Sequence, residues 1–206
     1  MFSDKFLLTK AVLEGRKTQT RRLIKCRKTF KGEWVAGFNI HIRPSDKKVI
    51  GLPCMYDADE SEFDGGEILP KYKVGEVVAV AQSYRDCGGL NEDGIPMWEI
   101  ISQKAGSSNA GWDNKMFVHA DLMPHQIRIT NVRIQRLQDI SDEDCLKEGI
   151  RKVVNENGID IQYYVGHSAC FENPREAFAH LINKVSRKDM WSENPYVFVY
   201  DFELVN

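Results

Sequence analysis

The apolar positions near the N-terminus repeat at helical spacing and then give way to an extended pattern. Apolar residues across 6–13 predict a short helix that starts after Ser3, a residue type favoured at helix N-caps, and ends at Glu14. Gly15 follows, and glycine readily adopts the left-handed conformation that closes a helix. Residues 18–24 then favour a strand, so we expect the chain to leave a helix end and continue extended.

Three strands are predicted from alternating or continuous apolar runs further along the chain. The run 77–80 predicts a short buried strand after a turn. Alternation over 127–137, with a change of phase near Thr130 and Asn131, predicts a long strand with a bulge. The last stretch, 196–205, alternates and is apolar on both faces in its first half, so we expect it inside a sheet.

Capping signals delimit two further helices and complete the predicted fold. Ser141 with an acidic residue three positions later resembles a capping box, and Gly149 closes that helix. Asn173 followed by Pro174 is a strong start for a longer helix. This order of elements predicts an α+β fold, a small mixed β-barrel with flanking helices, formed as a single domain over residues 1–206.

Three stretches with weak periodicity predict loop-rich insertions near 26–70, 85–125 and 151–172. The first contains three prolines and a cluster of acidic residues, and we expect it to hold one short hairpin. The stretch 87–110 is rich in glycine and serine, and is a candidate lid.

Charge is distributed unevenly over a chain of 206 residues that is 42% hydrophobic and 28% charged. The formal net charge of -2 argues against a protein that coats nucleic acid through bulk electrostatics. Residues 1–32, however, hold ten lysines and arginines against two acidic residues. Contact with an anionic partner must therefore be local, and a solvated basic face is the alternative for this end.

Five cysteines occur without a Cys-x-x-Cys pair or a short spacing to histidine, so we expect no metal site. An odd count without a signal peptide fits a reducing, cytoplasmic location. No segment is apolar enough to span a membrane, and we expect no membrane partner. The Gly-x-Gly-x-x-Gly and P-loop motifs are absent, which leaves no cofactor indicated.

The segment from Gly15 to Arg22 concentrates an amine, two hydroxyls, an amide and three guanidinium groups. Such density suits an anionic or carbonyl-bearing ligand, because arginine binds phosphate or carbonyl oxygen and threonine is a nucleophile beside a base. The alternative is an exposed edge strand protected by charge. Lys17 and Thr20 point to opposite faces of a regular strand, so a shared site requires a bend between them.

Glu148 occupies the last turn of the predicted 141–149 helix, where the helix dipole disfavours a carboxylate. This placement indicates a role other than helix stability. A solvated surface glutamate is the alternative.

The pattern Gly15-x-Lys17-x-x-Thr20-x-Arg22 after a short helix resembles the signature of the ASCH domain family, a PUA-like β-barrel group linked with RNA. Segments 72–76, 137–150 and 194–199 resemble further parts of that family in the same order, so that about half the chain is covered. The remainder resembles the insertions of longer, phage- and prophage-associated members. The fold that the resemblance implies is a PUA-like barrel.

Short bacterial members of that family include N4-acetylcytidine amidohydrolases, whose lysine, threonine and glutamate fall on Lys17, Thr20 and Glu148. The resemblance implies that Thr20 attacks the acetyl carbonyl, Lys17 takes its proton, and Glu148 orients or relays protons to the leaving cytidine amine. Arg22 would polarise the carbonyl or bind the base. Arg21 and Gln19 would be further substrate-binding residues.

One departure from the family and two other functions stay open. Longer members often carry a Trp-Val-Arg-Glu-Thr-Trp-like strand, whereas residues 79–84 here lack that arginine and carboxylate. The first alternative is a non-catalytic RNA-binding or modified-base-reading module. The second is a ribonuclease-like activity with Lys17 and Glu148 as acid and base. The expected partner is a modified nucleoside or single-stranded RNA, and the oligomeric state is not determined.

Overall fold

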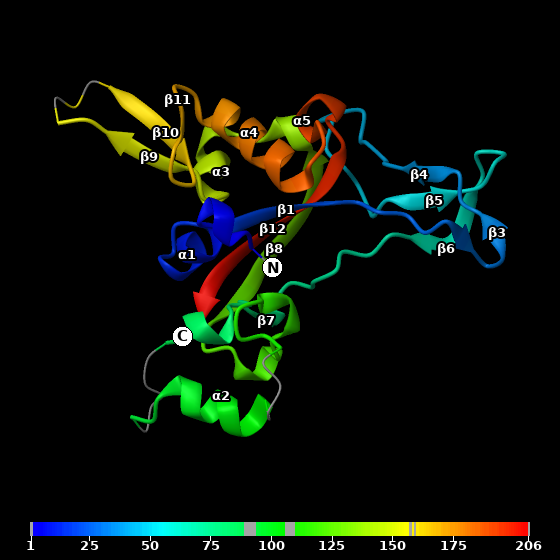
Figure 1. Ribbon diagram of the computed structural model, residues 1–206. Helices are drawn as coiled ribbons and strands as arrows, with labels where there is room; N and C mark the ends of the chain where they lie inside the picture. Colours follow the sequence, from blue (N-terminus) through cyan, green and yellow to red (C-terminus); the bar gives the residue numbers. More distant parts are fainter. Residues whose placement is uncertain (1, 89–93, 106–109, 157, 159, 206) are drawn as a thin grey trace.

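The computed structural model describes residues 2–88, 94–105, 110–156, 158 and 160–205. It is an α+β fold built on one curled antiparallel half-barrel sheet (Figure 1). The strand order of this sheet is β1 (Gln19–Leu23), β12 (Tyr196–Val205), β8 (Gln126–Arg136) and β7 (Val77–Ala79). The first and last strands of the chain are therefore neighbours. Strand β12 lies between β1 and β8, inside the sheet, as its apolar pattern predicts.

The long strand β8 carries the bulge that its apolar pattern predicts. Asn131 pairs with Asp201, and Ile129 pairs with Phe202, so Thr130 is the extra residue between them. A bulge bends a strand and increases its twist, which contributes to the curl of the sheet.

Strand β7 differs from its predicted form. The apolar run 77–80 predicts a buried strand, but β7 lies at the edge of the sheet and pairs with β8 alone. Val77 is 44% exposed, whereas Val80, just beyond the strand, is buried.

Three helices cover one face of the sheet (Figure 1). They are α3 (Asp142–Lys147), α4 (Pro174–Ser186) and α5 (Met190–Glu193). The caps agree with the sequence signals, because Ser141 accepts a hydrogen bond from the Asp144 amide and Asn173 accepts one from the Arg175 amide. These helices enclose a hydrophobic core with Val197 and Val199 of β12.

The N-terminal helix is broken rather than continuous. A 3₁₀ turn, η1 (Asp4–Phe6), precedes α1 (Leu8–Leu13), and Leu7 between them has a φ of 58°. Ser3 makes no side-chain cap, contrary to the prediction from its type. The helix ends where predicted, with Gly15 at a φ of 70°.

The other face of the sheet packs around aromatic residues of β12. Phe198, Tyr200 and Phe202 form a second core with Val12 of α1 and Val80. The two cores share β12, whose side chains alternate between them.

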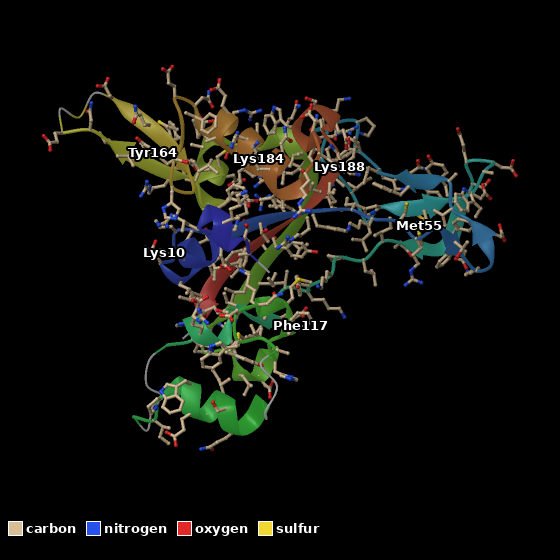
Figure 2. The ribbon with its side chains drawn as sticks, viewed as in Figure 1. Lys10, Met55, Phe117, Tyr164, Lys184 and Lys188 are labelled. Atoms are coloured by element: carbon tan, nitrogen blue, oxygen red, sulfur yellow. The ribbon has the colours of Figure 1, made fainter. Side chains whose placement is uncertain are left out.

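Each predicted insertion forms small elements of its own outside the central sheet. The first contains a hairpin, β2 (Thr29–Phe30) with β3 (Glu33–Trp34), and a three-stranded sheet of β4 (Gly37–Asn39), β5 (Cys54–Tyr56) and β6 (Glu62–Glu67). We call this first insertion the arm. It contains more strands than the single hairpin that the sequence predicts, because cross-strand pairing stabilises strands that are too short to show in the sequence pattern. Figure 2 marks one residue of each insertion, Met55, Phe117 and Tyr164.

The second insertion packs around a third core that includes Tyr84, Cys87 and Ile101. Its elements are η2 (Tyr84–Asp86), α2 (Met97–Ala105), η3 (Lys115–Phe117) and η4 (Ala120–Leu122). The candidate lid at 87–110 thus contains α2, and parts of it, 89–93 and 106–109, lie outside the described residues.

The third insertion is a three-stranded ribbon of β9 (Arg151–Val154), β10 (Ile161–Val165) and β11 (Ala169–Phe171). A final 3₁₀ turn, η5 (Leu137–Asp139), joins β8 to α3. Over the described part of the chain, no helix is both long and apolar enough to cross a membrane.

Candidate functional site

Strand β1 divides the basic motif between the two faces of the sheet. Gln19 and Arg21 are buried on the face that α3 covers, where they hydrogen-bond with each other. Thr20 and Arg22 alternate with them, and each lies directly opposite an aromatic residue of β12 on the other face. The six predicted site residues therefore do not form one cluster.

Lys17 and Glu148 come together although 131 positions separate them. The Lys17 Nζ donates to Glu148 Oε2 at 2.6 Å, to the Glu148 carbonyl at 2.8 Å and to the Gln19 carbonyl at 2.7 Å. The Glu148 carboxylate also accepts from Arg21 Nη1 at 3.0 Å. Because Arg21 and Lys17 share this carboxylate, the Lys17 ammonium lies on the helix-covered side of the sheet, away from Thr20.

The Lys17 ammonium is buried, and its hydrogen bonds are saturated. Its residue is 2% exposed, and its three protons all have acceptors. Burial lowers the pKa of Lys17, while the nearby Glu148 carboxylate opposes that shift. A general base needs a free lone pair directed at its substrate. This geometry instead anchors α3 to β1.

A closed ring of hydrogen bonds adjoins this pair through Arg21 and links α3 with three strands. Arg21 donates to the Gln19 amide oxygen and, at 3.2 Å, to Asp144 of α3. The Gln19 amide nitrogen donates to Asp201 of β12 at 2.6 Å. Arg133 of β8 closes the ring, donating to Asp201 and, at 2.9 Å, to Asp144. We call these five side chains the polar ring; Gln19 and Arg21 are buried, and the other three are half-buried.

The electrostatics of the ring favour the ionised form of Asp144. Although burial favours the neutral acid, Arg21, Lys147 and Arg133 hold the pKa of Asp144 below its ordinary value. Opposite charges alternate around the ring, as buried charges require.

A cavity of about 550 Å³ lies beside β8, near the end where that strand meets η5. Residues 132–136 form one wall, and within the described chain these residues pair only with β12, because β7 reaches only 126–128. The opposite wall is the segment between β4 and β5, which runs back toward the sheet and is bridged at Ile42 and Val49 (Figure 1).

The lining of this cavity combines cations with aromatic rings. The Arg136 guanidinium lies 3.9 Å from the centroid of the Tyr196 ring. Phe198 also lines the cavity, and its cross-strand neighbour on β1 is Arg22. The charged and aromatic residues of the lining are Lys47, Lys48, Arg133, Arg136, Asp139, Tyr196 and Phe198. Neither Arg22 nor Thr20 is among the lining residues, so the motif approaches the cavity only through Phe198, the cross-strand neighbour of Arg22.

Sequence reasoning named Glu148 but missed the other partners of the motif, Asp144, Asp201 and Arg133. Asp201 follows a run of five apolar and aromatic residues in β12, and this could have marked it as a polar site within the sheet. Lys47 and Lys48 carried no such signal, because adjacent lysines are usual in solvated loops. In the described part of the chain, no group of three or more histidine, cysteine, aspartate or glutamate residues is placed to bind a metal ion.

No family model matches this chain, and neither a curated protein nor a solved structure does. What the chain can do is therefore inferred from its residues and their geometry.

Proposed function

We propose that this chain is an ASCH-like protein with a PUA-like barrel, and that it binds a base of single-stranded RNA, or a modified nucleoside, in the cavity beside β8. The observation that carries the proposal is the joint presence of aromatic rings and cations in one open cavity. Its volume of about 550 Å³ is typical of sites for small ligands.

The lining suits each part of a nucleotide. Aromatic rings such as Tyr196 and Phe198 stack on bases, and the guanidinium plane of Arg136 does the same. Lys47 and Lys48 can neutralise phosphate. The edge of β8 at 132–136, which pairs with no second strand in the described part of the chain, offers backbone donors and acceptors to the polar edge of a base. Together these features favour a single-stranded nucleotide over a duplex, whose bases are stacked on one another.

Binding is favoured over hydrolysis by the arrangement of the motif. Thr20 and Arg22 lie on one face of the sheet, whereas Lys17 and Glu148 form a saturated pair on the other face. The ASCH resemblance supports the same proposal, because that family is linked with RNA.

The test is binding of a short, fluorescently labelled single-stranded RNA of mixed sequence, followed by anisotropy over a salt series. Lys47→Ala with Lys48→Ala should weaken binding and flatten the salt dependence, since each phosphate contact on a single strand contributes a slope of about 0.7. The matched control is Lys184→Ala with Lys188→Ala, two exposed lysines near the helices. No binding at low salt, or equal effects of both double variants, would refute the proposal. A denaturing gel of the same mixtures detects any cleavage of the RNA.

Deacylation of N4-acetylcytidine is the second candidate function, and the contact between Lys17 and Glu148 favours it. It requires segment 17–20 to rearrange so that the Thr20 hydroxyl meets a deprotonated Lys17. Chromatography of N4-acetylcytidine incubated with the protein tests it directly. Cytidine formed by the wild type but not by Thr20→Val would establish this deacylation. If the wild type forms no cytidine, the deacylation proposal is refuted, and the binding proposal is unaffected.

A further inference from the structure

Arg133 is the one residue that belongs both to the polar ring and to the charged lining of the cavity. Its side chain is 32% exposed. Each of its guanidinium nitrogens already donates a hydrogen bond: Nη1 to Asp201, Nη2 to Asp144 at 2.9 Å, and Nε to the Gln135 amide oxygen at 3.3 Å. The two Nη atoms each retain one more N–H for a ligand.

We infer that Gln19, Arg21 and Asp201 are positioning residues, which hold the Arg133 guanidinium in place for a ligand in the cavity. This inference rests on the proposed function. It gives the buried half of the basic motif a role in binding although Gln19 and Arg21 do not line the cavity.

Gln19 is the residue on which this role can be isolated. It is fully buried and is the one neutral member of the ring. Its amide orientation is determined by its partners, since the oxygen accepts from Arg21 and the nitrogen donates to Asp201. Loss of this amide leaves Arg21 and Asp201 each with one partner fewer, and Asp201 then holds Arg133 less firmly.

The ring should orient the Arg133 guanidinium toward the ligand rather than add to the electrostatic attraction between protein and RNA. Arg133 lies between two carboxylates, so its charge is largely compensated. An unrestrained arginine loses side-chain entropy when a ligand immobilises it, whereas a pre-positioned one loses less. A weakened ring should therefore lower RNA affinity without changing its salt dependence, unlike the lysine variants, which remove phosphate contacts.

The experiment is a double-mutant cycle of Gln19→Leu and Arg133→Ala, read by RNA affinity over a salt series. Gln19→Leu should lower affinity roughly tenfold at every salt concentration, and it should have little further effect once Arg133 is alanine. The control is Gln82→Leu, at a buried glutamine outside the ring. It should alter the melting temperature and leave affinity unchanged. Independent, additive losses from Gln19→Leu and Arg133→Ala would overturn the inference.

A second readout needs no RNA. The ¹⁵N guanidinium signals of Arg133, identified by their loss in Arg133→Lys, should be resolved in the wild type and should shift or broaden in Gln19→Leu. Unchanged signals would overturn the inference, whatever the affinities show. If the wild type binds no RNA, the proposed function fails, and these signals alone decide whether Gln19 positions Arg133.

Discussion

Replacement of Glu148 by alanine should destabilise this protein more than replacement of the lysine that it binds. Glu148 bridges Lys17 at 2.6 Å and Arg21 at 3.0 Å. The two cationic side chains are 2% and 1% exposed. Glu148→Ala therefore removes the carboxylate that Lys17 and Arg21 share, and both cations stay buried.

The expected loss follows from what remains around each cation. Removal of one partner from a buried ion pair typically costs about 3–5 kcal/mol, because an uncompensated charge stays in the interior. Lys17 keeps two carbonyl acceptors, and Arg21 keeps Gln19 and Asp144. Because two cations lose the same counter-charge at once, we expect a loss near the upper limit, about 5 kcal/mol, from a total stability on the order of 5–15 kcal/mol.

Lys17→Met is the matched comparison. It removes the buried cation itself, and Glu148 keeps Arg21 as its partner. The remaining cost is two carbonyl groups without this donor, at least about 1 kcal/mol each, and one lost charged hydrogen bond, at least about 1.5 kcal/mol, so we expect roughly 3–4 kcal/mol in all.

Urea unfolding of the wild type and both variants, followed by circular dichroism and extrapolated to water, measures these free energies. A Glu148→Ala loss below about 1 kcal/mol, or a larger loss from Lys17→Met, would refute the view that this carboxylate compensates two buried cations.

Three further predictions concern other parts of the molecule. The lowered pKa of Asp144 means that its ionised form stabilises the fold above the ordinary aspartate pKa of about 3.9, and that this contribution disappears as pH falls through the lower, folded-state value. Urea midpoints of Asp144→Asn should thus decline less steeply in acid than those of the wild type, and parallel curves would contradict this. Burial raises the pKa of Cys87 to about 11 and of Cys145 to about 12, and Cys54 is buried too. Mass spectrometry after alkylation at neutral pH should therefore find the two exposed thiols labelled in the native protein and all five in urea. Lys115 Nζ donates to the Phe2 carbonyl, to Asp4 at 2.7 Å and to Thr9 at 3.0 Å, so Lys115→Met should release the N-terminal segment. Limited proteolysis should then cut that segment faster, and an unchanged cleavage rate would count against this anchor.

Elements with local causes could be predicted from the sequence. Asn173 and Pro174 begin α4, Ser141 begins α3, and the phase change at Thr130 marks the bulge in β8. In each case the side chain or spacing that produces the feature lies within a few residues of it.

Elements that depend on distant partners could not be predicted in the same way. The arm formed by β2–β6 has strands of two to six residues, which are stabilised by pairing rather than by their own pattern. Val77 is apolar like Val80, yet it is exposed because β7 lies at the sheet edge. Position in the sheet, rather than residue type, decides this.

The candidate site also has one part that the sequence determines and another that depends on distant partners. By itself, the sequence determined that Gln19 and Arg21 lie on one face of a strand and that Thr20 and Arg22 lie on the other, because side chains alternate along extended backbone. Only the tertiary structure decided what each face meets. Helix α3 brings Glu148 and Asp144 onto the first face, where buried charges must be paired. The segment around Lys47 forms a cavity along β8, and Phe198, the neighbour of Arg22, lines this cavity from the second face.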